Sequence, residues 1–244
     1  MVFAQAAVQP PASTCVNAQA ASLCLNQQVF DVAGASPKLL VVYLPDAFAD
    51  APAAMAVAAD GSAAIALSQQ LKATAIAIRP MAMPPNASPY VIRAEEVSAY
   101  ADALRKIRSS YPGKKILLVG HASGAVMAAL LASTTPASAD AFLLAACPCD
   151  MPAWRRWRNS STTAPTLSPA DETGKVSPQV RLAVVVGNRD DNTLPKFSET
   201  YVSRLQARGV KTRLTTAANA THVSVQRAPE FFMLAQSLAD ELSR

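Results

Sequence analysis

The sequence lacks long apolar runs, although 51% of its 244 residues are hydrophobic. No stretch approaches the roughly 18 consecutive apolar residues that a membrane-spanning helix needs, so we expect no transmembrane segment. Aromatic residues make up only 6% of the chain and alanine is abundant, which indicates alanine-rich helices packed on an aliphatic sheet. Charged residues are also few, at 16%, so the chain is not disordered in bulk and its length suits one sizeable domain.

A nucleic-acid-binding surface is missing from the pattern of charges. The net charge is +5 and the pI is near 9.2, which on their own would suggest a nucleic-acid or membrane partner. Lys and Arg are scattered, however, apart from a cluster of Arg155, Arg156 and Arg158, and no aromatic stacking platform accompanies them. We therefore expect a basic enzyme with no nucleic-acid and no membrane partner. A surface-binding module built on residues 154–158 is the alternative.

The four cysteines and the first residues point to export. A disulfide between Cys15 and Cys24 would fit an exported protein, whereas Cys147 and Cys149 form either a tight bridge or two thiols. Residues 1–7 are typical of the end of a signal peptide near its cleavage site, without the basic and apolar regions that precede it. We expect a periplasmic or secreted protein whose signal has been removed; an ordinary flexible N-terminus is the alternative.

The order of apolar segments predicts the fold class. Residues 1–26 are rich in Ala, Gln, Ser and Pro, and we expect them to be irregular. Residues 27–244 predict a single α/β domain with a mostly parallel sheet covered by helices on both faces, and residues of about 147–178 form a lid-like insertion. The expected strands are 29–32, 39–44, 74–78, 116–119, 142–146, 180–186 and 212–217, and the expected helices are 62–71, 95–110, 124–132, 195–208 and 229–243.

One turn carries the strongest chemical signal. A buried strand runs into Gly120-His121-Ala122-Ser123-Gly124, and an apolar helix follows at once. This is the strand–turn–helix setting of the nucleophile elbow, G-x-S-x-G. Its glycines remove Cβ atoms that would collide with the strained backbone. The helix N-terminus supplies N–H groups near a developing oxyanion.

The nucleophile position of this elbow, residue 122, holds alanine. A methyl group cannot attack a carbonyl, so the chain should be nearly inactive. We interpret Ala122 as a Ser→Ala substitution in an active parent enzyme. Two alternatives stay open: a natural pseudoenzyme, and Ser123 acting as nucleophile in a shifted elbow, although its side chain should point away from the cleft.

The remaining members of a catalytic triad should follow in the order acid, then histidine. The loop after the strand at 180–186 contains Asp190 and Asp191; counting from Gly187 favours Asp190, and counting back from Pro195 favours Asp191. We prefer Asp190, which would hold the histidine and stabilise its imidazolium form.

The base is chosen from only two histidines. His222 lies in the loop after the last expected strand, where a general base belongs, whereas His121 lies inside the elbow as a structural residue. Neither lies at a spacing that suits a structural zinc site, so we expect no metal. The oxyanion hole needs two backbone N–H donors: Ser123 is one, and because proline has no N–H, Asp46 or Ala47 in the loop after the strand at 39–44 is the other.

These motifs carry a family resemblance. The order GHASGA, GNRDDN and then His222 resembles the α/β-hydrolase superfamily over roughly residues 27–244. The segment GNRDDNTLPKFSETYVSRLQARGV is similar to the acid loop and following helix of prolyl-oligopeptidase-like hydrolases, in which the first Asp of Asp-Asp-Asn is the triad acid. The resemblance therefore implies Asp190 as the acid, Asn192 near the substrate, and no cofactor or metal. The run CPCDMPAWRR from Cys147 also resembles small exported bacterial α/β-hydrolases, whereas the His-Gly that many relatives carry in the oxyanion loop is absent.

The sequence also suggests a substrate wall. Trp154 and Trp157 in the lid, interleaved with arginines, either line the substrate or pack the lid on the body, and Tyr90 in a Pro-rich loop lines the same cleft. We expect a serine hydrolase, a monomer or homodimer, that cleaves a small-molecule carboxylic ester through an acyl-enzyme in its parent form. A small amidase or peptidase with the same triad, or a catalytically dead binding protein, is the alternative.

Overall fold

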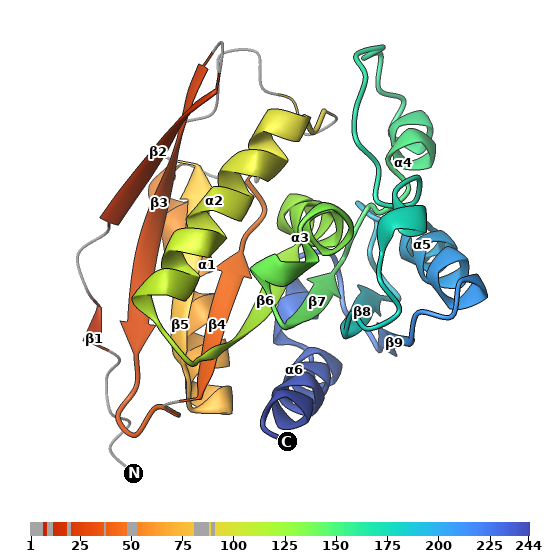
Figure 1. Cartoon of the computed structure of the whole chain (residues 1–244). Helices are drawn as coiled ribbons and strands as arrows, with labels where there is room; N and C mark the ends of the chain where they lie inside the picture. Colours follow the sequence, from red (N-terminus) through yellow and green to blue (C-terminus); the bar gives the residue numbers. More distant parts are fainter. Residues whose placement is uncertain are drawn as a thin grey trace.

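The computed structural model has one sheet at its centre and helices on both faces of that sheet (Figure 1). It describes residues 7–8, 12–18, 21–36, 38–47, 53–80, 88 and 91–244. Within these residues nine strands join in the order β1-β3-β5-β4-β6-β7-β8-β9, and β2 pairs with β3 off this path. The expected α/β architecture, with a mostly parallel sheet covered by helices on both faces, is confirmed.

Six neighbouring strands run parallel to one another. Their apolar residues are buried because helices cover both faces of the sheet. The parallel direction brings the carboxyl ends of β6, β8 and β9 to one edge, where the loops that carry residues 122, 190 and 222 begin. The six strands are β5 (Thr74–Pro80), β4 (Leu39–Leu44), β6 (Lys115–His121), β7 (Ala141–Ala145), β8 (Leu182–Gly187) and β9 (Thr212–Ala217).

The helices divide the core into two layers. On one face α2, α3, α4 and α5 pack on the sheet, and on the other face α1 and α6 do so. The expected helix at 62–71 is longer, because residues 53–61 continue it toward the N-terminus. The helices are α1 (Ala53–Leu71), α2 (Ala94–Ser110), α3 (Ser123–Thr134), α4 (Met151–Trp157), α5 (Pro195–Ala207) and α6 (Pro229–Leu242), with the short 3-10 turns η1 (Pro136–Ser138), η2 (Thr173–Lys175) and η3 (Ser224–Arg227).

The expectation that residues 1–26 are irregular is wrong. The structure places Ala7–Val8 in β1, Ala12–Ala18 in β2 and Ala21–Asp31 in β3. β2 and β3 form an antiparallel hairpin, and β3 pairs antiparallel with β5 at the edge of the parallel strands. Because the hydrogen bonds of a hairpin come from the backbone, small and polar residues can form it without a strong apolar alternation.

The lid-like insertion contains one short helix and one 3-10 turn. Helix α4 follows β7, and η2 precedes β8. Asp150 caps α4, since its side chain accepts a hydrogen bond from the N–H of Ala153 at 3.1 Å. Helix α4 lies against α5 beside the carboxyl ends of β7 and β8 (Figure 1). The segment expected to form a lid, residues 147–178, is therefore packed against α5 next to the loops that carry the candidate site.

Candidate active site

The turn between β6 and α3 has a strained backbone at residue 122. Ala122 adopts φ 52° and ψ −114°, a conformation that L-residues rarely adopt and that persists mainly at functional sites. A Cβ at Gly120 would lie 2.3 Å from the carbonyl oxygen of Gly124, and a Cβ at Gly124 would lie 2.0 Å from that of Leu44. Both glycines are therefore required by close backbone approach, as the elbow motif predicts.

The strained turn is held by neighbouring strands. The N–H of Ala122 donates to the carbonyl of Ala145 at the end of β7, at 3.0 Å. Ala122 is 4% exposed and lies at the edge of the sheet where the acid and histidine loops also begin. The position thus has the geometry of a nucleophile elbow, and the side chain lacks the nucleophilic atom.

Asp190 lies in the loop after β8 and is the carboxylate that contacts the base candidate. Its Oδ2 atom lies 3.0 Å from Nδ1 of His222, and its Oδ1 atom accepts from the N–H groups of Asn192 at 2.9 Å and Thr193 at 2.7 Å. Asp190 is 3% exposed, whereas Asp191 is exposed to solvent. The structure thus pairs His222 with Asp190 rather than with Asp191.

The contact fixes the tautomer of His222. An ionised carboxylate only accepts hydrogen bonds, so Nδ1 of His222 carries the proton and donates it to Asp190. In the neutral imidazole Nε2 is then the unprotonated atom, which is the form that a general base needs. The ring is nearly buried, which keeps it in one orientation.

His121 supports the loop of the other histidine. Its Nε2 atom lies 2.8 Å from the carbonyl oxygen of His222 and donates to it, and the two ring centroids are 5.1 Å apart. Burial lowers the pKa of His121 and the charge of His222 lowers it further, while Asp46 and Asp190 act in the opposite direction. His121 is therefore a neutral, buried donor, which agrees with the structural role expected for it.

The side chain of Ser123 connects the elbow to the loop after β4. Ser123 Oγ donates to Asp46 Oδ1 at 2.6 Å and accepts from the N–H of Ala47 at 2.9 Å. The two segments expected to form an oxyanion hole are therefore joined in the structure. The N–H of Ala47, one of the two expected donors from this loop, is engaged with Ser123. No sequence spacing could have revealed this contact, because its partners lie 77 positions apart.

The tryptophans of the lid pack on the body. Trp154 is 7% exposed and its Nε1–H donates to the carbonyl of Asn192 at 2.9 Å. Trp157 packs on Phe197 with ring centroids 5.9 Å apart, and the guanidinium of Arg158 lies 5.8 Å from the centroid of Trp157. Of the two interpretations left open, the structure thus shows contacts of the packing kind. Tyr90, the third expected wall residue, lies outside the described residues.

The second cysteine pair borders the site. Cys147 and Cys149 follow β7 with their sulfur atoms paired and their Cα atoms 5.1 Å apart. The backbone register of the β2–β3 hairpin sets Cys15 opposite Cys24.

Among the described residues, no group of three or more His, Cys, Asp or Glu side chains could hold a metal ion, and no described helix is long and apolar enough to cross a membrane.

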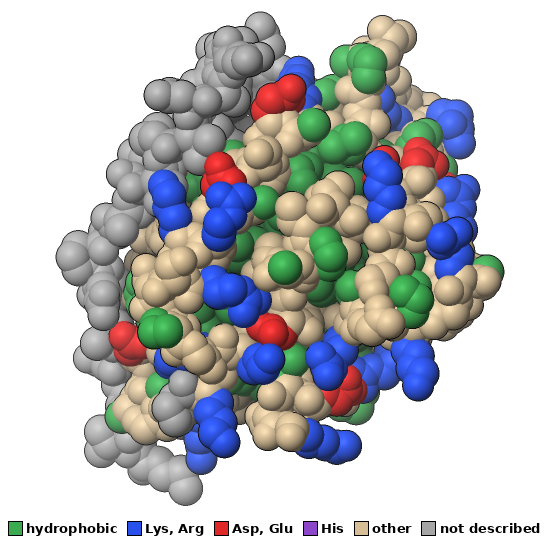
Figure 2. Space-filling view, in the orientation of Figure 1, with side chains coloured by type: hydrophobic (Ala, Val, Ile, Leu, Met, Phe, Trp, Pro, Cys, Tyr) green, Lys and Arg blue, Asp and Glu red, His purple; other side chains and the backbone are tan. Residues whose placement is uncertain are grey.

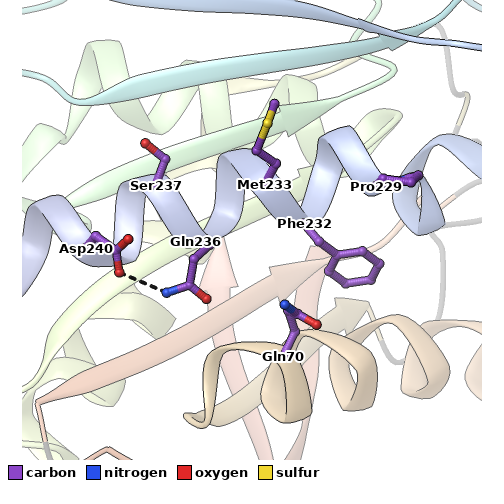
Figure 3. A pocket seen from close by; sticks show the side chains of 7 residues that line it. All are labelled: Gln70, Pro229, Phe232, Met233, Gln236, Ser237 and Asp240. Atoms are coloured by element: carbon purple, nitrogen blue, oxygen red, sulfur yellow. Dashed lines mark hydrogen bonds between the residues drawn. The ribbon is translucent and has the colours of Figure 1, made fainter.

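A separate pocket of about 650 Å³ lies on the opposite face of the sheet. Figure 3 shows Phe232 of α6 beside Gln70 of α1, and Gln236 bonded to Asp240 along α6. The pocket is lined by neither of the two histidines and by no pair of facing charged groups, so it is not the candidate active site. Its lining residues are Gln70, Pro229, Phe232, Met233, Gln236, Ser237 and Asp240.

The fold and the geometry at the carboxyl edge of the sheet are those of an α/β-hydrolase. A model of the prolyl oligopeptidase family matches residues 93–237, which is more than half of the chain, and the chain belongs to this family. The match begins next to α2 and includes the elbow, Asp190 and His222. No curated protein sequence matches the chain.

Solved structures with the same fold include esterases and a peptidase. An esterase of Pyrococcus furiosus is 14% identical with a TM-score of 0.68, over 96% of this chain and 92% of that one. An esterase of Pyrobaculum calidifontis is 13% identical with a TM-score of 0.66, over 98% and 86% of the two chains. A putative dipeptidyl aminopeptidase IV of Bacteroides ovatus is 12% identical with a TM-score of 0.65, over 98% of this chain and 36% of that one.

Proposed function

We propose that this chain is the scaffold of a serine hydrolase that cleaves carboxylic esters, with alanine at the position of the nucleophile. The observation that carries the proposal is the buried Asp190–His222 pair, whose hydrogen bond leaves Nε2 of His222 able to accept a proton. The elbow with its strained residue 122 leaves from the same edge of the sheet. Asp190 is the proposed acid and His222 the proposed base, and only the nucleophilic oxygen is missing from this triad.

The proposed chemistry uses a serine at residue 122. Nε2 of His222 takes the proton of the serine hydroxyl while its oxygen attacks the ester carbonyl, and Asp190 stabilises the imidazolium. The N–H of Ser123 and a second N–H from the loop after β4 hold the oxyanion of the tetrahedral intermediate; because the N–H of Ala47 donates to Ser123 Oγ, the proposed second donor is that of Asp46. The proton passes from His222 to the leaving alcohol, and the C–O bond of the ester breaks. Water then attacks the acyl-enzyme with the same proton transfers and releases the acid.

With Ala122 this sequence stops before its first step. No bond can form between a methyl group and the ester carbonyl, so the chain should bind its substrate and leave it intact. We interpret Ala122 as a Ser→Ala change relative to an active parent. Retention of Asp190 and His222 supports this view, because a protein without catalysis has no evident need for a buried acid–base pair.

Esters are preferred to amides as the proposed substrate class. The two archaeal structural neighbours are esterases, and the alignment with each spans most of both chains. The peptidase-like neighbour is aligned over only 36% of its own chain. The same triad can cleave amides, so a small amidase or peptidase is the alternative within this class.

A second candidate is a binding protein on a hydrolase scaffold. Ala122 favours it, because the strained turn persists without a nucleophile. This candidate predicts that restoring a serine yields no turnover and that the ligand need not be an ester.

We propose that the protein acts in the periplasm or outside the cell. Its proposed substrate is a small molecule, and its proposed state is a monomer or homodimer. The two cysteine pairs support export. Lys and Arg side chains are spread over the visible face rather than gathered in one patch, which supports the absence of a nucleic-acid or membrane partner (Figure 2). Fractionation of the cells that make the protein would test the location.

Ala122→Ser tests the proposed function directly. Because loss of a triad nucleophile costs up to about a millionfold in rate, we expect Ala122→Ser to raise turnover of short p-nitrophenyl esters by at least about 10⁴-fold. A burst of p-nitrophenol should equal the enzyme concentration. The unchanged chain and the double variant Ala122→Ser/His222→Ala are the matched controls, and both should stay near background.

Anilide substrates of the same acyl groups separate the alternatives. Faster turnover of the anilides than of the esters would shift the proposal to an amidase. If Ala122→Ser folds normally and cleaves neither esters nor anilides, the hydrolase proposal is wrong and the binding protein takes its place. Turnover in the Ala122→Ser/Ser123→Ala variant would show that Ser123 is not the nucleophile.

A further inference from the structure

The lid reaches the acid loop through one buried hydrogen bond. Nε1–H of Trp154, on α4, donates to the carbonyl of Asn192 at 2.9 Å. The indole is almost fully buried in the core layer that also contains α5. A buried indole N–H is costly to leave without an acceptor, so this bond fixes where the carbonyl of Asn192 can point.

The peptide group that accepts this bond also contacts Asp190. The carbonyl of Asn192 and the N–H of Thr193 belong to one planar peptide unit, so the direction of one sets the direction of the other. The N–H of Thr193 donates to Oδ1 of Asp190 at 2.7 Å, and Oδ2 of Asp190 accepts from Nδ1 of His222 at 3.0 Å. Four groups thus form a continuous series from the lid to the base.

Consecutive hydrogen bonds through one peptide polarise each other. A donor on the carbonyl makes the N–H of the same peptide a better donor, which strengthens its bond to the carboxylate. The bond from Trp154 therefore both orients the N–H of Thr193 toward Asp190 and makes it a stronger donor. Removing the indole N–H would leave a carbonyl that is free to rotate away and would take the N–H of Thr193 with it.

Helix α4 is fixed within the insertion, and the segment just before it is bonded to α5. The N–H of Met151 donates to Ser168 Oγ at 3.2 Å, and the carbonyl of Cys149 accepts from the N–H of Ala170 at 2.9 Å. The carbonyl of Cys147 accepts from Ser198 Oγ on α5 at 2.8 Å. The indole of Trp154 is thus presented from an element with a defined position.

We propose that Trp154 is a positioning residue, which holds the peptide between Asn192 and Thr193 so that Asp190 orients His222. The inference rests on the proposed function, because it assigns a purpose to the Asp190–His222 pair. It gives the lid a part in setting the geometry of the acid and the base, in place of the substrate wall expected from the sequence.

Histidine nitrogen spectra test this proposal on the chain as it stands. Because the chain has only two histidines, the ¹⁵N signals of His121 and His222 can be assigned by one substitution. We compare the unchanged chain with Trp154→Phe, which keeps a ring and removes the N–H, and with Trp157→Phe as the matched control. Trp157 makes the ring contact with Phe197, on the same helix-to-body interface.

In the unchanged chain and in Trp157→Phe, we expect His222 to be protonated at Nδ1, with a low-field proton signal. In Trp154→Phe we expect that proton, and the amide of Thr193, to exchange with solvent at least tenfold faster. Loss of ring packing alone would affect both variants, whereas loss of the hydrogen bond to the carbonyl of Asn192 affects only Trp154→Phe. Equal exchange rates in the unchanged chain and Trp154→Phe would overturn the proposal.

Two further measurements address the case in which Trp154→Phe does not fold, and the effect of losing the Trp154 N–H on catalysis. Benzothienylalanine at position 154 keeps the two-ring shape and replaces only the N–H, so it should reproduce the exchange change of Trp154→Phe in a folded protein. In the Ala122→Ser background, Trp154→Phe should lower kcat about tenfold with KM unchanged. If Ala122→Ser proves inactive, the histidine spectra still decide the positioning role, so the two proposals fail separately.

Discussion

At the scale of single residues, the elbow leaves no room for a side chain at Gly124. A Cβ there would lie 2.0 Å from the carbonyl oxygen of Leu44 and 2.6 Å from that of Pro45, and neither backbone group can move without displacing the end of β4. We expect Gly124→Ala to lower the free energy of unfolding by about 3 kcal/mol or more. Urea denaturation followed by circular dichroism measures this loss.

Gly174→Ala is the matched control. The nearest atom to a Cβ at Gly174 is the guanidinium carbon of Arg208 at 4.0 Å, and Gly174 lies in η2. We expect a change within about 0.5 kcal/mol in either direction. Equal losses in the two variants would mean that the close approach of the elbow to β4 is not what requires Gly124.

Single residues also mark the limit of what the sequence predicted at the site. The Asp190–His222 pair was predicted because the order of motifs along the chain constrains it, and the structure brings the two side chains together. The contact of Ser123 with Asp46 was not predicted, nor was that of Trp154 with Asn192. Such contacts depend on side-chain direction after folding, which no local pattern of residue types encodes.

At the scale of elements, Asp140 connects three of them. Its Oδ2 atom accepts from the N–H of Ile116 in β6 at 2.9 Å and from Arg108 in α2 at 3.0 Å, and Oδ1 accepts from Lys115 at 3.2 Å. Burial acts to raise the pKa of Asp140, but the bonds from Ile116, Arg108 and Lys115 outweigh it and lower the pKa. The carboxylate therefore holds the end of α2 at the start of β6 and β7.

We expect Asp140→Ala to lower the free energy of unfolding by about 2 kcal/mol, because the N–H of Ile116 loses its acceptor. Asp140→Asn keeps that acceptor and should lose only about 1 kcal/mol. The exposed pair of Asp102 and Arg105, one turn apart on α2, is the control, and Asp102→Asn should change stability by less than about 0.5 kcal/mol. Thermal and urea unfolding give the three values, and an Asp140→Ala loss no larger than that of Asp102→Asn would contradict the role.

The elements show which sequence signals were reliable. The parallel strands were predicted because buried strands in such a sheet are apolar along their whole length. Apart from residues 29–31 of β3, which were expected as a strand, the β2–β3 hairpin was missed, because most of its residues are small or polar. The start of α1 was placed nine residues late, since an alanine-rich segment has no apolar face to distinguish helix from loop.

At the scale of the whole molecule, the two histidines tie together the loops at the carboxyl edge of the sheet. His121 belongs to the elbow and bonds to the backbone of the loop that carries His222, and Tyr43 of β4 donates to Gln226 in η3 just beyond it. Three segments far apart in the sequence, the elbow, β4 and residues 222–226, are thus connected, and the neutral imidazole of His121 makes one of the two bonds. The protonation state of His121 should therefore affect the stability of the whole fold.

The pH dependence follows from the lowered pKa of His121. In the unfolded chain this histidine has a pKa near 6.5, and burial, followed by the charge of His222, lowers it in the folded protein. Below about pH 6.5 the unfolded state binds a proton that the folded state does not. The free energy of unfolding should therefore be constant above about pH 6.5 and fall as the pH decreases, by at most about 1.4 kcal/mol per pH unit until the folded pKa is reached.

His121→Gln separates this effect from other titrating groups. The glutamine amide can donate to the carbonyl of His222 but does not titrate, so the decrease between pH 6.5 and pH 5 should become smaller by the amount that His121 contributes. Burial raises the pKa of Glu96, which acts with the opposite sign, and both chains share it, so the difference between their curves gives the contribution of His121 together with its interaction with His222. Urea denaturation at pH 5 to 8 gives both curves. Parallel curves would show that His121 is protonated as easily in the folded protein as in the unfolded chain, and that burial does not keep this imidazole neutral.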